Sequence, residues 1–397
     1  MAIKKNFDKK SLESLEQSYE ELKQTVELSF GSIEDPRAIA NKKHKLLDII
    51  FITICAVIGG ANNLSEVVIF VDTHRKWFSK IIELPHGIPS YSVFWWIFVL
   101  MRPEILQESL KKWILVMTKG KLGKHVAVDG KALRGSATNA SSFIHTVSAW
   151  ASDFHVTLAQ KKVDCKSNEI TAIPEVLKNL DLKGCTITID AMGTQKKISN
   201  QIREQGADYI LALKGNQESI CDEVENFFIQ AEKCNFGGIE HDVFCEDSNK
   251  EKHGRIEKRT VYVTSEIDWL PQKKQWRDLQ SIVMVISERT IKGETTTERR
   301  MYISSRKPTA KIHGYFIRRH WGVENECHWI LDVSFREDES KLRTGYLPEN
   351  FSTIRRIALS LLKQDKETKG GIEAKRKRAG WCTDYLEKIL NFIKSLV

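Results

Sequence analysis

The spacing of hydrophobic and polar positions changes along the chain, and the change separates a helical first part from an α/β second part. In roughly the first 118 residues, apolar positions recur every three or four residues, which is the period of an amphipathic helix. Helices are predicted over residues 8–30, 46–58, 64–81, 90–101 and 103–117.

Beyond residue 119, short apolar runs alternate with helical patterns. Strands are predicted over residues 125–130, 142–151, 155–163, 186–191 and 207–214, and helices over 168–180, 194–205 and 217–233. Residues 239–305 have the pattern of strands only. The chain then continues with a helix over 314–338, a helix over 349–364, a basic segment over 366–378 and a helix over 382–395. This order predicts an α/β fold with a mixed sheet.

The length of 397 residues allows two or three domains with sizeable cores. We expect a helical N-terminal domain over residues 1–118, a core in two parts over 119–216 and 309–397, and a β-rich inserted subdomain over 217–308. No apolar run reaches the roughly 20 residues that cross a bilayer. The N-terminus also lacks the apolar core of a signal peptide. We therefore expect a cytoplasmic protein with no membrane partner.

Charge and cysteine usage narrow the function only a little. The formal net charge of +9 favours a polyanionic partner, although this charge alone leaves nucleic-acid binding and its absence equally open. The eight cysteines are scattered without short paired spacings. The sequence therefore indicates neither a zinc site nor a disulfide framework.

Three acids stand where a metal site could form. Asp129 and Asp190 each follow an apolar strand, and Glu324 lies within the predicted helix 314–338. If the two strands are neighbours in a mixed sheet, their carboxylates converge at one edge, and the helix brings the third. Oxygen ligands of this kind suit Mg²⁺ or Mn²⁺. Two such ions about 4 Å apart could activate an attacking oxygen and neutralise the leaving oxygen of a phosphodiester.

Each acid taken alone has a plainer explanation. A carboxylate at a strand end is more often a turn cap or a solvated residue, and Glu324 is better explained as an ion-pair partner of Arg319 or His320. Three other acids compete for the same role, and spacing does not exclude them: Asp153, Asp164 and Asp332.

Basic and aromatic residues surround these acids in the sequence and could contact DNA. The candidates are Lys131, Arg134, Lys214, Asn216, His253, Arg255, Arg318, Arg319, Trp321, Asn325 and His328. Trp321, His328 and Trp329 could stack on an extruded base. The alternatives are charge balance around buried acids, a solvated hairpin face and, for at least one tryptophan, core packing.

A run of motifs resembles the bacterial insertion-sequence transposases of the Asp-Asp-Glu class, in the group of the H-repeat-associated proteins. The matching segments extend over nearly the whole chain. They are DPR at 35–37, LLDIIFITICAVIGGANN at 46–63, LPHGIPS at 84–90, VAVDGKALRGS at 126–136, HTVSAWAS at 145–152, KSNEITAIP at 166–174, TIDAMGTQKKI at 188–198, GADYILALKGNQ at 206–217, HGRIEKR at 253–259 and RRHWGVENECHWILDVSFRED at 318–338.

The resemblance implies a ribonuclease-H-like core with a β-rich insertion before its last helix. It also implies that Asp129, Asp190 and Glu324 form the catalytic, metal-binding triad. The implied activity is cutting at transposon ends with two Mg²⁺ or Mn²⁺ ions and joining of the 3′ hydroxyl to target DNA. The implied partners are double-stranded DNA and at least a second copy of the chain, and the protein would act at the bacterial nucleoid.

Some positions depart from the pattern of the family. The family usually has a histidine, an aspartate and an arginine after IPS, where this chain has Tyr91, Ser92 and Trp95. His320 stands where related transposases have an arginine, and Thr194 where the family has a cysteine. Two other hypotheses therefore stay open, namely a nuclease without strand joining and a DNA-binding relic without catalysis.

Overall fold

A computed structural model describes residues 42–117, 122–138, 142–163, 169–247 and 255–391, together with residues 20, 21, 24, 26–28 and 30–38. The first part of the chain is helical, as its apolar period predicts. Its helices are α2 (Leu46–Ile58), α3 (Leu64–Thr73), α4 (Arg75–Phe78), α5 (Tyr91–Leu100) and α6 (Pro103–Met117). The single helix predicted over 64–81 is wrong, because the chain leaves helical geometry at His74. The helix predicted over 8–30 falls mostly outside the described residues.

All strands of the described chain that pair in ladders belong to one sheet, in the order β3-β2-β1-β4-β5-β9-β8-β7-β6. The strands are β1 (His125–Leu133), β2 (Ile144–Ala151), β3 (Val156–Lys162), β4 (Thr186–Ile189), β5 (Asp208–Leu213), β6 (Asp242–Asp247), β7 (Arg255–Thr264), β8 (Ser281–Ile291) and β9 (Glu294–Ser304). Strands β4 and β5 run parallel to β1, and the other pairings are antiparallel. The predicted mixed sheet is confirmed.

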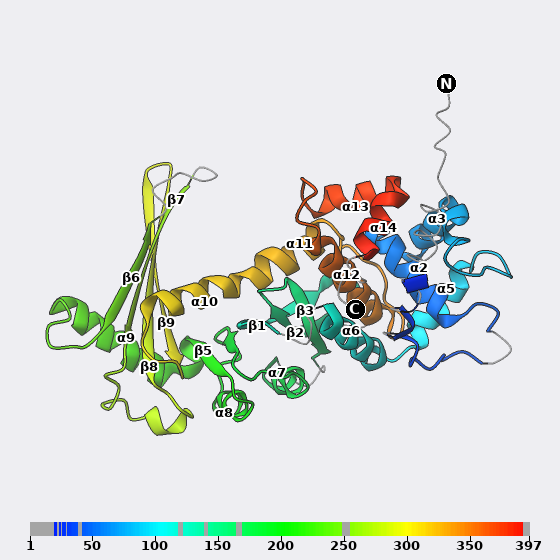
Figure 1. Ribbon diagram of the computed structural model, residues 1–397. Helices are drawn as coiled ribbons and strands as arrows, with labels where there is room; N and C mark the ends of the chain where they lie inside the picture. The colour runs from blue at the N-terminus through cyan, green and yellow to red at the C-terminus, as the bar shows by residue number, and fades with distance from the viewer. Residues whose placement is uncertain are drawn as a thin grey trace.

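The β-rich region continues this sheet. Strand β9 pairs with β5 through Ile210 and Ser304, so β6 to β9 extend the same ladder that begins at β3. Figure 1 shows these strands at the opposite end of the molecule from helices α2, α3 and α5, with α10 (Ala310–Val323) running from them towards the centre. Helix α10 contacts β6 and β7 as well as β1 and β4.

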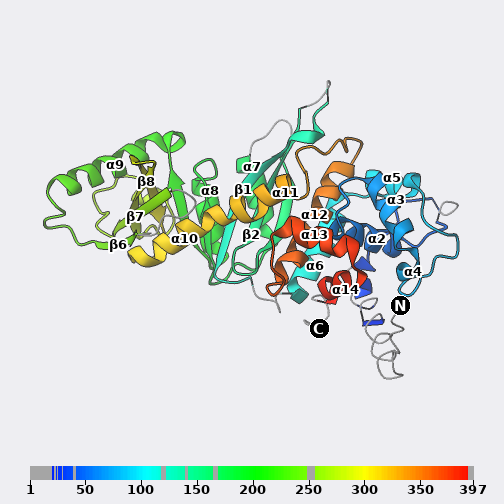
Figure 2. The same cartoon turned by 90° about the horizontal axis from the view of Figure 1, so that it is seen from above.

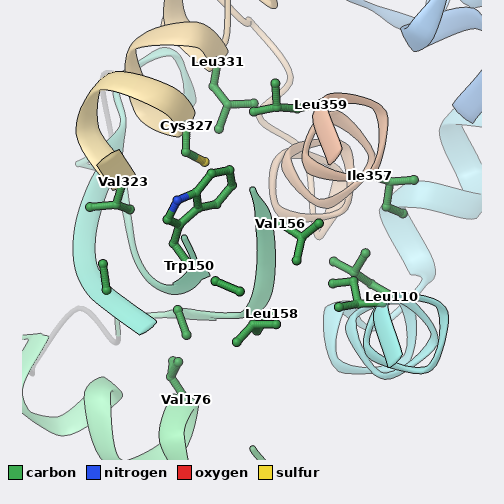
Figure 3. Packing of buried hydrophobic residues seen from close by; sticks show 14 of the residues in the cluster. Leu110, Trp150, Val156, Leu158, Val176, Val323, Cys327, Leu331, Ile357 and Leu359 are labelled. Carbon is green, nitrogen blue, oxygen red and sulfur yellow. The ribbon is translucent and has the colours of Figure 1, made fainter. Parts of the chain in front are cut away.

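Helices pack on both sides of the sheet (Figures 1 and 2). Helices α7 (Glu169–Lys178) and α8 (Lys196–Glu204) lie together on one side and α10 on the other, while α9 (Glu218–Lys233) packs near β8 and β9. The core continues from the sheet into the helical part. Figure 3 shows the Trp150 indole of β2 beside Val323 and Cys327, with Leu110 of α6 and Ile357 of α12 (Leu347–Gln364) close together. Burying large apolar side chains in this way is the main favourable contribution to folding.

The C-terminal region differs from its prediction in two places. The helix expected over 314–338 is interrupted by a π-helix, Glu324–His328, and ends with α11 (Trp329–Val333). A helix that the sequence did not indicate, α13 (Ile372–Trp381), begins within the basic segment 366–378. It is followed by α14 (Thr383–Asn391). Helix α13 has no apolar stripe. Instead it buries Arg376, whose guanidinium donates to the carbonyl oxygens of Val57 and Ala61.

None of the helices in the described ranges combines the length and the apolar character needed to cross a membrane. The described cysteines are all free.

Candidate active site

Three acids from three separate elements line one cavity of about 540 Å³. Asp129 lies in β1, Asp190 directly follows β4, and Glu324 is the first residue of the π-helix. The parallel register of β1 and β4 pairs Val128 with Ile189, so the next residue on each strand is one of the acids. The structure thus brings together the three acids that the sequence singles out.

Asp129 is in the most unfavourable environment of the three. Burial and the nearby charge of Asp190 raise its pKa to about 7, although the Gly130 N–H donates to Asp129 Oδ1 at 2.9 Å. A buried carboxylate favours its neutral form unless a positive charge or enough hydrogen bonds stabilise the ion. A cation in the cavity would supply that charge.

Glu324 and Asp129 face the same ring nitrogen. His328 Nδ1 lies 3.2 Å from Glu324 Oε2 and 3.5 Å from Asp129 Oδ2. One ligand atom from each of these residues lies within 4.8 Å of the others, so the three could hold a metal ion. The edges of an octahedron with bonds of about 2.1 Å are roughly 3.0 Å long. The His328–Glu324 contact at 3.2 Å is a hydrogen bond in this structure, and the same spacing would also suit two ligands of one ion.

Glu324 and His328 are the first and last residues of the π-helix, four positions apart. A π-turn accommodates one more residue than an α-turn, and such turns are frequent at functional sites. His328 is only 2% exposed and faces the acids, so its ring has no open face for the base stacking suggested by the sequence. Its Nε2 has no hydrogen-bond partner among the described residues. The only polar contacts of the ring are therefore those of Nδ1.

Lys131 is also buried, and its charged end is paired inside the protein. Its Nζ donates to both carboxylate oxygens of Asp332 at 2.7 Å and lies 3.9 Å from Asp338. The expectation was a phosphate contact. In the structure this side chain ties β1, two residues after Asp129, to helix α11. Asp332, one of the competing acids, is occupied by this pair.

Several residues that the sequence predicts to contact DNA form hydrogen bonds or ion pairs with other residues of the protein at the surface. Arg319 donates to the Ser152 carbonyl and to the Tyr315 hydroxyl, and it pairs with Asp153 at 3.2 Å, so a second competing acid is occupied. The other contacts are Arg318 with Glu246 at 2.7 Å, Arg255 with Glu257 at 2.9 Å, Arg134 with Asp338 at 3.6 Å, Asn216 with the Ala191 carbonyl, and Asn325 with the Trp321 carbonyl.

The cavity wall adds basic and aromatic groups. Lys214 lines it, as predicted for a residue near the acids. Trp321 is 42% exposed, and the Arg300 guanidinium carbon lies 4.6 Å from its ring centroid. Sequence reasoning missed Arg299 and Arg300, which also line the cavity. In the sequence, the available signal was this adjacent pair of arginines within the strand-rich region 239–305. Of the other candidates, His253 and Asp164 lie outside the described residues.

A hydrogen-bonded chain that reaches the cavity wall beside the acids was also missed. Thr188 Oγ1 lies 2.9 Å from His320 Nδ1 and 2.8 Å from His125 Nε2. Burial lowers the pKa of His320 to about 4 and that of His125 to about 3, so both rings are neutral at neutral pH. His320 thus brings a neutral hydrogen-bonding group where related transposases have a positively charged arginine. A second missed residue, Glu169, lies beside Gly130, and its place in the KSNEITAIP segment was the only signal.

Comparison with known families agrees with this site. The family model described as Transposase DDE domain matches residues 120–361, and a model described as DDE_Tnp_1-associated matches residues 28–114. The chain therefore belongs to the DDE transposase family, which confirms the resemblance seen in the sequence.

Two bacterial relatives extend over nearly the whole chain. YncI of Escherichia coli O157:H7 is 37% identical over 365 residues, which cover 90% of this chain and 92% of that protein. The H repeat-associated YhhI of Escherichia coli strain K12 is 37% identical over 377 residues, covering 93% and 98%. Both are named as transposases. Among solved structures, the piggyBac transposase synaptic complex with hairpin DNA gives a TM-score of 0.43 at 12% identity, covering 94% of this chain and 79% of that one.

Proposed function

We propose that this chain is an active DNA transposase that cuts phosphodiester bonds at transposon ends and joins the freed 3′ hydroxyl to target DNA. The observation that carries the proposal is the convergence of Asp129, Asp190 and Glu324 on one cavity from positions far apart in the sequence. Membership of the DDE family supports it independently.

The donor set fits hard divalent cations. Asp129, Asp190 and Glu324 would hold Mg²⁺ or Mn²⁺, with two ions per site, and His328 would add a nitrogen donor beside Glu324. Bound divalent ions supply an activated attacking oxygen and neutralise the leaving oxygen. Asp129 is central because it lies next to both Asp190 and Glu324, as its electrostatic interactions indicate.

The protein side of the reaction is positioning. The π-helix holds Glu324 and His328 against β1, and the Lys131–Asp332 pair ties the same strand to α11. Lys214, Arg299 and Arg300 on the cavity wall would attract the DNA phosphates, and the exposed Trp321 ring is available for stacking. Arg134, Arg255, Arg318, Arg319 and Asn325 stay candidates for contacts to DNA around the cavity. For the engaged Lys131 and Asn216, a supporting role through the protein is a better proposal than a DNA contact, and for the buried His328 it is the nitrogen donor beside Glu324.

We also propose that the core is ribonuclease-H-like. The order β3-β2-β1-β4-β5, with only β2 antiparallel to both of its neighbours, supports this assignment. The DNA ends would be held by an assembly of at least two copies, since joining requires both transposon ends at once.

The test is a Mg²⁺-dependent cleavage and joining assay on DNA that carries the inverted repeats flanking the gene. Replacing Glu324 by Gln or Asp129 by Asn should abolish cleavage and leave DNA binding largely intact. The matched control is Glu326→Gln. Glu326 lies two residues from Glu324, but its carboxylate pairs with His155. It should keep cleavage.

The same assay separates the alternatives. Retained cleavage in Glu324→Gln would refute the site assignment. Nicked DNA without joined product would favour a simple nuclease. Salt-dependent DNA binding with no metal-dependent product would identify a relic that only binds.

A further inference from the structure

A fourth acid lies at the site, on an element that carries none of the predicted ligands. Glu169 is the first residue of α7. Its carboxylate lies against the backbone of Gly130, the residue after Asp129. A Cβ added at Gly130 would come within 2.0 Å of Glu169 Oε1 and 2.7 Å of Oε2. Any side chain at this position of β1 would displace Glu169. The glycine therefore makes room for a carboxylate next to Asp129.

Glu169 differs from its neighbours on α7 in its polar contacts. Within the described ranges it makes no hydrogen bond and no ion pair, and the other group that acts on it is the like charge of Asp190. The contrast with Glu175 on the same helix is informative, because Glu175 pairs with Lys161 at 3.1 Å. Lys161 thus lies within reach of α7 and pairs with Glu175, whereas Glu169 lies beside Gly130.

The placement adds a further negative group beside Asp129, because Glu169 lies against the backbone of the next residue. Like charges crowded in a partly buried site repel one another unless a cation is bound between them. Lys131, the nearest lysine along β1, is directed to Asp332.

We propose that Glu169 is a fourth carboxylate of the metal centre, acting on the Asp129–Asp190 side through a water ligand of the bound ion. The proposal rests on the proposed function, because it takes divalent ions to bind there. The set of three close ligand atoms among the described residues comprises Asp129, Glu324 and His328 and leaves out both Asp190 and Glu169. Asp190 lines the cavity whereas Glu169 does not, so the role proposed for Glu169 is water-mediated. Mg²⁺ and ions like it usually keep several waters, which neighbouring carboxylates can hold.

The experiment is a Mn²⁺ titration of the full chain, with free Mn²⁺ measured by electron paramagnetic resonance, combined with thermal unfolding of the metal-free protein. Glu169→Gln should weaken binding of one ion by about 10- to 100-fold, as losses of such supporting groups do. The metal-free Tm should stay equal or rise, because the amide removes a repelling charge. Glu175→Gln is the matched control on the same helix and should bind Mn²⁺ like the wild type.

A second variant tests the room that the glycine provides. Gly130→Ala should weaken Mn²⁺ binding in the same direction, since its methyl group occupies the place of the Glu169 carboxylate. Unchanged Mn²⁺ affinity in Glu169→Gln would overturn the inference, and so would a lower metal-free Tm with unchanged affinity, which marks a purely structural residue. Absence of Mn²⁺ binding in the wild type would instead overturn the proposed function itself.

Discussion

Two largely buried acids, Glu337 and Asp129, are in opposite electrostatic environments. Glu337 is 2% exposed and lies 3.3 Å from Arg356 and 3.8 Å from Arg355, while Ser352 donates to it. Burial alone would raise its pKa, but the two arginines hold that pKa below the ordinary value. Asp129 has no such arginines, and its pKa is raised to about 7. One acid is balanced by the protein, whereas the other would be balanced by the divalent ions proposed above.

The largest change in the free energy of unfolding is expected when Glu337, the acid paired with the two arginines, is replaced. Replacing Glu337 by Gln should lower the free energy of unfolding by about 3–5 kcal/mol, because it leaves buried arginine charges without their acid. Asp129→Asn should leave the metal-free protein equally stable or more stable. Urea unfolding of both variants without metal measures the difference. Similar losses in the two variants would remove the contrast.

Mn²⁺ should stabilise the folded protein only through the site around Asp129, and not through Glu337. At a free Mn²⁺ concentration 100 times the dissociation constant, the wild type should gain about 2.7 kcal/mol from one ion. The double variant Asp129→Asn, Glu324→Gln should gain almost nothing, whereas Glu337→Gln should keep the gain despite its lower starting stability. Unfolding with and without Mn²⁺ provides the measurement, and a gain in the double variant would place the ion elsewhere.

The stability of the metal-free protein and its affinity for Mn²⁺ should change with pH in opposite directions. The folded-state pKa of Asp129 is raised from its ordinary 3.8 to about 7, so folding favours its protonated form. The stability that this group contributes to the metal-free protein is present below pH 3.8 and is lost as the pH rises through 7. Mn²⁺ affinity should follow the opposite course, rising towards pH 7 as the carboxylate ionises. Asp129→Asn should flatten both profiles between pH 5 and about 7.5, and titrations across this range would show it.

The smallest effect is expected at an exposed pair. Arg318 and Glu246 lie 2.7 Å apart, and each side chain is about half exposed. Such pairs contribute roughly 0–1 kcal/mol, so Arg318→Ala should hardly change the Tm. If Arg318 contacts a DNA phosphate, the same variant should reduce the salt dependence of DNA binding by about one unit of slope. An unchanged slope would remove Arg318 from the DNA surface.

The sequence was most informative where a physical constraint is local. Apolar runs located the strands, and the acids after β1 and β4 meet because parallel register places strand ends side by side. The partners of charged residues could not be predicted, since Lys131 and Asp332 are 201 positions apart in the sequence. Helix α13 was missed because its buried face includes Lys375 and Arg376, which a hydrophobic pattern counts as exposed. Glu169 was missed because only the fold brings α7 beside Gly130.

The π-helix has a consequence for the whole segment that follows it. The extra residue offsets the faces of α10 and α11 by about 100° relative to an uninterrupted α-helix. The offset keeps the buried face continuous, because Val323 and Leu331 are eight residues apart, which an uninterrupted α-helix would place about 80° apart around its axis, yet both are fully buried. Deleting a single residue between 324 and 328 would restore the regular winding and keep α11 in phase with α10. Glu324 and the histidine would then be three residues apart and would still share a face, so such a variant would isolate what the π-turn itself contributes.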